Sequence, residues 1–217
     1  MKSSFPKTFV VVMARMVGAL IFVVGTDLLS AASSDQVFTL WWTSRALGVL
    51  AYLGLWFSVL FGVLVSSRGA GGLLAPGMMI DLHTRWALVA IAATVLHVLM
   101  IVGDPKASLV PWQAIVPFAS PKARGALGLG SVAMWLLLAV ASSTYLFERI
   151  PKAVWRAVHA LAFGTYLLAL SHALMIGSAA DEPLMFTVYL ATTGILVAAL
   201  VQRVLLAAVP NPTKHSN

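Results

Sequence analysis

Long apolar segments, bounded by prolines, glycines or short polar stretches, run through most of the chain of 217 residues. A helix needs about 20 mostly apolar residues to cross a bilayer, and six segments meet that length. No internal repeat and no long polar linker separates them. The pattern predicts an all-α integral membrane protein with a single transmembrane domain over residues 1–217, built as a six-transmembrane-helix bundle. The predicted helices cover residues 9–31, 42–66, 82–103, 126–147, 153–177 and 184–206.

The composition excludes other classes of protein. Hydrophobic residues make up 60% of the chain and charged residues 10%, whereas a soluble domain carries about 25% charged residues. A soluble globular domain, a disordered chain, a collagen-like chain and a coiled coil are therefore excluded. Because the sequence has no cysteine, disulfides, iron–sulfur clusters and thiolate-bound zinc are excluded too. The five histidines are then the strongest metal ligands available.

The first apolar segment allows two readings. Lys2 and Lys7 precede it, and the small residues 30–33 follow it, which resembles a cleaved signal peptide. Against cleavage, Arg15 interrupts the apolar run, and the segment is long for the apolar part of a signal peptide. We therefore expect it to be retained as the first transmembrane helix.

The sparse charges indicate how the bundle is oriented. The formal net charge is +7, and the basic residues stand at the ends of apolar segments, which is typical of membrane orientation rather than of nucleic-acid binding. With a cytoplasmic N-terminus, ten of the 14 Lys and Arg residues fall on the cytoplasmic side. We therefore expect both termini in the cytoplasm of a multi-pass protein of the inner (plasma) membrane. The basic residues on the outer side are Arg45, Lys106, Lys122 and Arg124.

Four of the five histidines lie on two predicted helices that run in the same direction. His83 and His97 lie on the third helix, and His159 and His172 on the fifth. At a rise of about 1.5 Å per residue, the two histidines of each helix are roughly 20 Å apart. His83 and His159 are then near the cytoplasmic face, and His97 and His172 near the outer face. The sequence predicts two histidine pairs at matched depths.

Two imidazoles facing each other at each of two depths suit two b-type haems, because a low-spin haem iron takes two axial ligands and neutral imidazole is a good one. The carboxylates of each haem need basic partners near the membrane surface. Arg45 is available at the outer depth, and Arg85 or Arg156 at the inner depth. The expected cofactors are therefore two haem b, and the expected function is electron transfer across the membrane.

The spacing of the histidines fits ideal geometry on one helix only. A spacing of 14 residues brings His83 and His97 to within about 40° of each other on an ideal helix, so they share a face. A spacing of 13 leaves His159 and His172 about 140° out of alignment. An ideal straight helix does not explain how both point to their partners.

Two alternatives of other classes stay open. A transporter or proton-relay protein without haem would use intramembrane histidines too, since ionisable residues inside membranes are costly and mostly functional. It would not need the depth matching, and the interiors of the second to sixth predicted helices hold no Asp or Glu to complete a relay. A purely structural membrane subunit is the other alternative.

The sequence around the four histidines resembles a known family, the ferric reductase-like transmembrane domains. The resemblance rests on residues 154–159 with 171–174, on Asp81-Leu82-His83 with His97, and on residues 116–120 in the outer loop, and it covers about residues 40–178, the expected haem-binding core. It extends to NADPH oxidases, ferric-chelate reductases and stand-alone bacterial members. A related member, the membrane subunit of bacterial methionine sulfoxide reductase, has Arg where this chain has His83.

The resemblance implies that His83 and His159 hold an inner haem, that His97 and His172 hold an outer haem, and that Arg45 is the basic residue near the outer haem. Electrons would pass from the cytoplasmic side to ferric iron or a periplasmic redox protein outside. No dinucleotide-binding glycine fingerprint followed by a βαβ unit occurs in the chain. We therefore expect any flavin to lie on a partner, and the donor to be a separate flavin or NAD(P)H reductase or a quinol. The chain would then be the electron-transfer subunit of an oxidoreductase.

Overall fold

A computed structural model describes residues 35–67, 75–177 and 182–208, and this part of the chain is helical without any strand. The predicted first segment, residues 9–31, lies outside the described residues. The helices are α2 (Asp35–Ser67), α3 (Pro76–Gly103), α4 (Pro111–Ile115), α5 (Arg124–Tyr145), α6 (Lys152–Ile176) and α7 (Pro183–Ala208).

Five of the described helices, α2, α3, α5, α6 and α7, are long and apolar enough to cross a membrane. They correspond to the second to sixth predicted segments, with bounds that differ by at most two residues except at the starts of α2 and α3, which lie seven and six residues earlier. For α2 the added residues begin at Asp35, and for α3 they form its first turns. That helix begins earlier than expected, at Pro76, because proline suits the first position of a helix, where its missing N–H costs nothing. The short α4 lies in the proline-rich connection between α3 and α5 and was not predicted.

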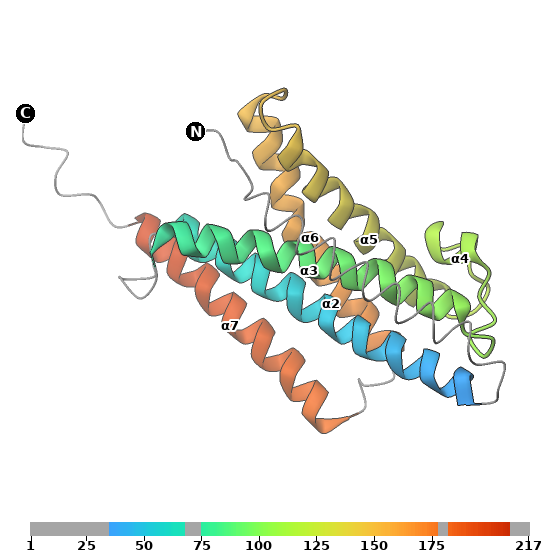
Figure 1. The fold of residues 1–217 in the computed structure, drawn as a ribbon. Helices are drawn as coiled ribbons and strands as arrows, with labels where there is room; N and C mark the ends of the chain where they lie inside the picture. The colour runs from blue at the N-terminus through green and yellow to red at the C-terminus, as the bar shows by residue number, and fades with distance from the viewer. Residues whose placement is uncertain (1–34, 68–74, 178–181, 209–217) are drawn as a thin grey trace, which may run out of the picture.

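The helices form two antiparallel hairpins and a flanking helix (Figure 1). α2 and α3 lie side by side as the first hairpin, α5 and α6 form the second and cross the first obliquely, and α7 packs along α2. The close packing of α2 against α3 depends on Gly54, where a Cβ atom would lie 3.1 Å from the backbone nitrogen of Ala90.

The core lies at mid-depth, where α2, α6 and α7 meet. Tyr52 is 4% and Tyr166 2% exposed, and their rings stack with centroids 5.8 Å apart. The Tyr52 hydroxyl hydrogen-bonds the hydroxyls of Tyr166 at 3.0 Å and Thr192 at 2.6 Å, and Trp56 Nε1 donates to the Thr192 carbonyl at 2.7 Å. These bonds satisfy polar groups that a bilayer interior offers no water to solvate. The outward face of α7 is apolar and exposed, as a lipid-facing helix requires; it includes Leu184, Leu190 and Val204.

Candidate functional site

The four intramembrane histidines form two pairs of facing rings. The ring centroids of His83 and His159 are 5.8 Å apart with planes at 59°, and those of His97 and His172 are 6.4 Å apart with planes at 82°. These are the pairs that depth predicts from the sequence. Within the described residues no three His, Asp or Glu side chains gather in a group that could hold a metal ion.

The two histidines of α3 are held by two serines of α2. His83 Nδ1 lies 2.7 Å from the carbonyl oxygen of Ser58, and His97 Nδ1 lies 2.8 Å from that of Ser44. A carbonyl oxygen only accepts hydrogen bonds, so Nδ1 carries the proton in both rings and Nε2 keeps a free lone pair when the ring is neutral. The Ser58 hydroxyl donates back to the His83 carbonyl at 3.1 Å.

The two histidines of α6 differ from each other. His172 Nδ1 donates to the carbonyl of Ala126, on α5, at 2.8 Å. His159 Nδ1 is buried and has no hydrogen-bond partner among the described residues. The His159 ring instead stacks on Trp155, with centroids 4.8 Å apart and planes at 20°, and the buried Trp155 Nε1 also has no partner there. Three of the four rings are therefore anchored through Nδ1, and one is not.

A glycine lies under each anchored ring. A Cβ atom would lie 3.1 Å from the His97 ring at Gly48, 3.3 Å from the His83 ring at Gly62, and 2.7 Å from His172 Nδ1 at Gly130. The first two values are tighter than nine in ten real Cβ contacts, and the third is a distance that real Cβ atoms essentially never show. A side chain at any of the three positions would therefore push the ring away.

Both histidines of α6 face a partner on α3 although 13 residues separate them. Their other neighbours differ, because His172 bonds Ala126 on α5 and His159 stacks on Trp155 of its own helix. α6 crosses α3 obliquely (Figure 1).

A cavity of about 560 Å³ surrounds the outer pair. His97 and His172 line it together with mostly apolar side chains, and His83 and His159 do not. Its charged lining residues are Arg45, Asp104, Lys106 and Lys122.

Asp104 is the buried charge of this cavity. It is 2% exposed; its Oδ1 accepts a hydrogen bond from the backbone N–H of Lys106 at 2.9 Å, and its Oδ2 has no partner among the described residues. The absence of acids inside the predicted helices therefore does not extend to the helix end, because Asp104 caps the C-terminus of α3.

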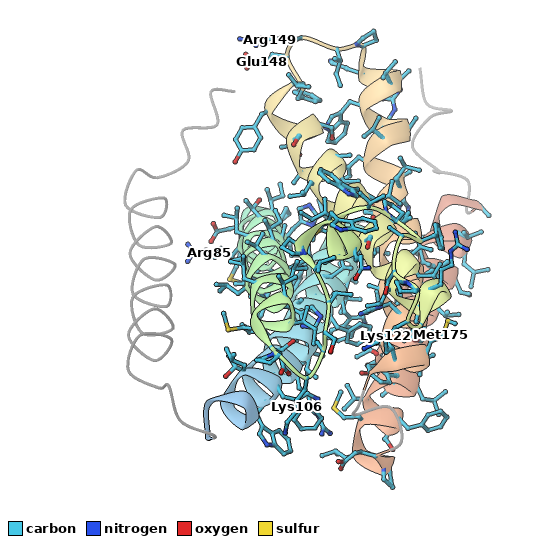
Figure 2. The ribbon with its side chains drawn as sticks, turned by 90° about the vertical axis from the view of Figure 1, so that its right-hand side faces the viewer. Arg85, Lys106, Lys122, Glu148, Arg149 and Met175 are labelled. Carbon is cyan, nitrogen blue, oxygen red and sulfur yellow. The ribbon has the colours of Figure 1, made fainter. Side chains whose placement is uncertain are left out.

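The three arginines proposed from the sequence lie in different surroundings. Arg45 lines the outer cavity, forms an ion pair with Glu182 at 3.1 Å and lies over the ring of Trp42. Arg85 is exposed, pairs with Asp81 at 2.7 Å and points outward from α3, away from α5 and α6 (Figure 2). Arg156 is exposed on α6, one turn before His159.

Sequence reasoning missed the serines and glycines that contact the α3 histidines, although a signal for them exists. Ser44 and Ser58 are 14 residues apart, and so are Gly48 and Gly62, which is the spacing of His83 and His97. An equal spacing on neighbouring antiparallel helices brings each histidine to the same type of partner. No comparable pattern marks Asp104, Lys106 or Lys122 as cavity residues, because they lie in the irregular connection after α3.

The chain belongs to the family described as Domain of unknown function (DUF8596), whose model matches residues 39–179. No curated protein and no solved structure matches the chain at a significant level. The matched segment spans α2 to α6 almost completely and contains all four paired histidines, while α7 lies beyond it.

Proposed function

We propose that this DUF8596 protein is a membrane b-type cytochrome of the ferric reductase-like kind, which passes electrons across the membrane through two haem b. His83 and His159 would hold the inner haem, and His97 and His172 the outer one. A separate flavin or NAD(P)H reductase or a quinol would supply electrons on the cytoplasmic side. Ferric iron or a periplasmic redox protein would take them up outside. The bundle would have six membrane helices with both termini in the cytoplasm.

The pairing of four intramembrane histidines at two depths carries the proposal, and the ring separations are compatible with it. Two imidazoles bound to one metal ion through Nε2, with metal–nitrogen bonds of about 2 Å and ring centres about 1.1 Å beyond each nitrogen, have ring centres about 6.3 Å apart. The observed separations are 6.4 Å for the outer pair and 5.8 Å for the inner pair. Packed aromatic rings also have centroids about 4.5–7 Å apart, as the Tyr52 and Tyr166 rings do at 5.8 Å. The separations of the histidine rings are therefore compatible with a shared metal ion, and the pairing of four intramembrane histidines at two depths is what favours it. The free Nε2 lone pairs of His83, His97 and His172 suit axial ligands as well.

The outer cavity supports the proposal at one of the two sites. Its volume of about 560 Å³ lies within the range of cofactor pockets, roughly 300–1,000 Å³. Its apolar lining suits a porphyrin, and Arg45, Lys106 and Lys122 supply positive charge for the two porphyrin carboxylates. Haem bound there would supply one-electron redox chemistry. The chain itself would ligate the iron, exclude water and fix the separation of the two centres.

The haem-free alternative has one structural feature in its favour. Tyr52, Thr192, Tyr166 and Thr193 form a chain of hydrogen bonds through the core, and Asp104 adds a buried acid at the outer end. A proton relay could use such a chain. It would not need two histidine pairs at matched depths, and the visible spectrum of the purified protein separates the two functions.

The test is a reduced-minus-oxidised visible spectrum of the full chain, purified from cells supplied with haem. We expect two b-type components, because the two sites differ in their ring angles and surroundings. His83→Ala and His159→Ala should each remove the same component, and His97→Ala and His172→Ala the other. His215→Ala, in the polar tail, is the matched control and should keep both. A colourless preparation would refute the proposal.

A further inference from the structure

Three of the four paired histidines share one local arrangement. Each anchored ring donates Nδ1–H to a backbone carbonyl and lies on a glycine four residues further along the same helix: Ser44 with Gly48, Ser58 with Gly62, and Ala126 with Gly130. The arrangement occurs twice on α2 and once on α5, facing two different helices. His159 lacks it, since its Nδ1 has no partner among the described residues.

Helix geometry explains why a glycine is needed there. The carbonyl of residue i is already bonded to the N–H of residue i+4, and the Cα–Cβ bonds of a helix tilt toward its N-terminus. A side chain at i+4 therefore covers that carbonyl from one side. Without a Cβ atom, the carbonyl oxygen stays open to a second donor, and an imidazole can lie flat against the helix. The short contacts at Gly48, Gly62 and Gly130 follow from this geometry.

We propose that Gly48, Gly62 and Gly130 are positioning residues that fix the proton on Nδ1 of His97, His83 and His172 and so leave Nε2 of each ring free to face its partner. The outer pair is then held at both rings, whereas the inner pair is held at His83 alone. His159 keeps its orientation through stacking on Trp155, which fixes no proton on the ring. The inference rests on the proposed function only where it concerns haem.

The anchoring has a second consequence for a bound metal. A histidine that donates its other N–H to a carbonyl has a fixed ring orientation and is a more basic ligand, and losing such a partner typically costs about 10- to 100-fold in metal affinity. The two ring planes of the outer pair, at 82° to each other, are both fixed in this way. The angle between axial imidazole planes sets the anisotropy of the electron paramagnetic resonance signal of a low-spin ferric haem. The outer centre should therefore give a highly anisotropic signal with a narrow distribution of g values. The inner centre should give a wider distribution, because only one of its rings is fixed.

The first experiment needs no haem. The full chain is labelled with ¹⁵N-histidine, and the ring nitrogens are assigned with His→Gln variants. We expect His83, His97 and His172 as the Nδ1–H tautomer and His159 as a mixture. Alanine substitutions should reduce the Nδ1–H fraction of one histidine each, most in Gly130→Ala, less in Gly48→Ala and least in Gly62→Ala, following the contacts of 2.7, 3.1 and 3.3 Å. Gly164→Ala is the matched control, because a Cβ atom there meets nothing within 4 Å.

The second experiment titrates the same variants with haemin. Gly130→Ala and Gly48→Ala should weaken the outer site about 10- to 100-fold and broaden its resonance signal, with the inner site unchanged. Gly62→Ala should weaken the inner site and broaden its signal, with the outer site unchanged. If Gly130→Ala fails to fold, Gly48→Ala and Gly62→Ala still test the inference, since each crowds its ring less tightly. Unchanged tautomers in folded Gly48→Ala and Gly62→Ala, or equal effects in Gly164→Ala, would overturn the inference. Failure of wild-type protein to bind haemin would instead refute the proposed function and leave the tautomer result standing.

Discussion

Among single side chains outside the histidine pairs, Tyr52 gives a prediction for the stability of the core. Its hydroxyl bonds Tyr166 and Thr192 in the buried core, so Tyr52→Phe leaves both partners one hydrogen bond short while keeping the ring. Tyr166 keeps its bond to Thr193, and Thr192 keeps its bond to the Val188 carbonyl. Each lost hydrogen bond costs about 0.5–1.5 kcal/mol, so the loss of two costs about 1–3 kcal/mol. We expect Tyr52→Phe to lower the free energy of unfolding in mixed micelles by that amount. Tyr145→Phe is the control, because Tyr145 is 74% exposed and should change little. Equal effects of the two substitutions would show that the hydrogen bonds are not what stabilises the core.

Also at the scale of residues, the sequence predicted which histidines pair but not which residues contact their rings. Depth alone pairs His83 with His159 and His97 with His172, because rise per residue is the same in every helix. Which atom of each ring is free depends on contacts between helices, and these follow from packing. The Asp81 that pairs with Arg85 stands one helical turn before it, a spacing that could have been recognised in advance.

At the scale of helices, apolar length predicted the membrane segments well and their packing poorly. Five predicted segments match α2, α3, α5, α6 and α7, since lipid exposure requires a minimum apolar length. α4 was missed because five residues are too few to show a helical period. The angle at which α6 crosses α3 (Figure 1) has no local signature in the sequence, because it depends on contacts between helices.

The contact between α2 and α3 positions both histidine pairs at once, and this gives a prediction for Gly54. In Gly54→Ala the new methyl group meets backbone atoms of Ala90 at 3.1–3.2 Å, and backbone cannot turn aside as a side chain can. Overpacking of this kind costs about 1–3 kcal/mol, more than the helix propensity that alanine gains, up to about 1 kcal/mol. We expect lower thermal stability and weaker haemin binding at both centres together. Gly194→Ala on α7, where a Cβ atom meets nothing within 4 Å, should not be destabilised. Loss at one centre only would contradict the shared role of the interface.

At the scale of the whole molecule, the distribution of charge predicts which end of the bundle faces the cytoplasm. Ten of the 14 Lys and Arg residues are expected at the end with the connection between α5 and α6. The other four, Arg45, Lys106, Lys122 and Arg124, are expected at the end with the connection between α3 and α5, where the cavity around His97 and His172 opens. Glu148 and Lys106, which mark these two connections, lie at opposite ends of the structure (Figure 2). If the basic end is cytoplasmic, the outer cavity faces away from the cytoplasm, and under the proposed function it would receive electrons last.

Because the chain has no cysteine, introduced cysteines can report this orientation without background labelling of the chain itself. Ser108→Cys places a thiol in the exposed connection after α3, and Glu148→Cys places one in the exposed connection between α5 and α6. In intact cells a membrane-impermeant maleimide should label Ser108→Cys and leave Glu148→Cys unlabelled, because the end of the bundle with more Lys and Arg residues stays on the cytoplasmic side during insertion. After the membrane is permeabilised both should react, which shows that each thiol is accessible. Labelling of Glu148→Cys alone in intact cells would show that the bundle has the opposite orientation. His83 and His159 would then face outward, and the histidine pair inside the cavity would be the first to receive electrons from a cytoplasmic donor.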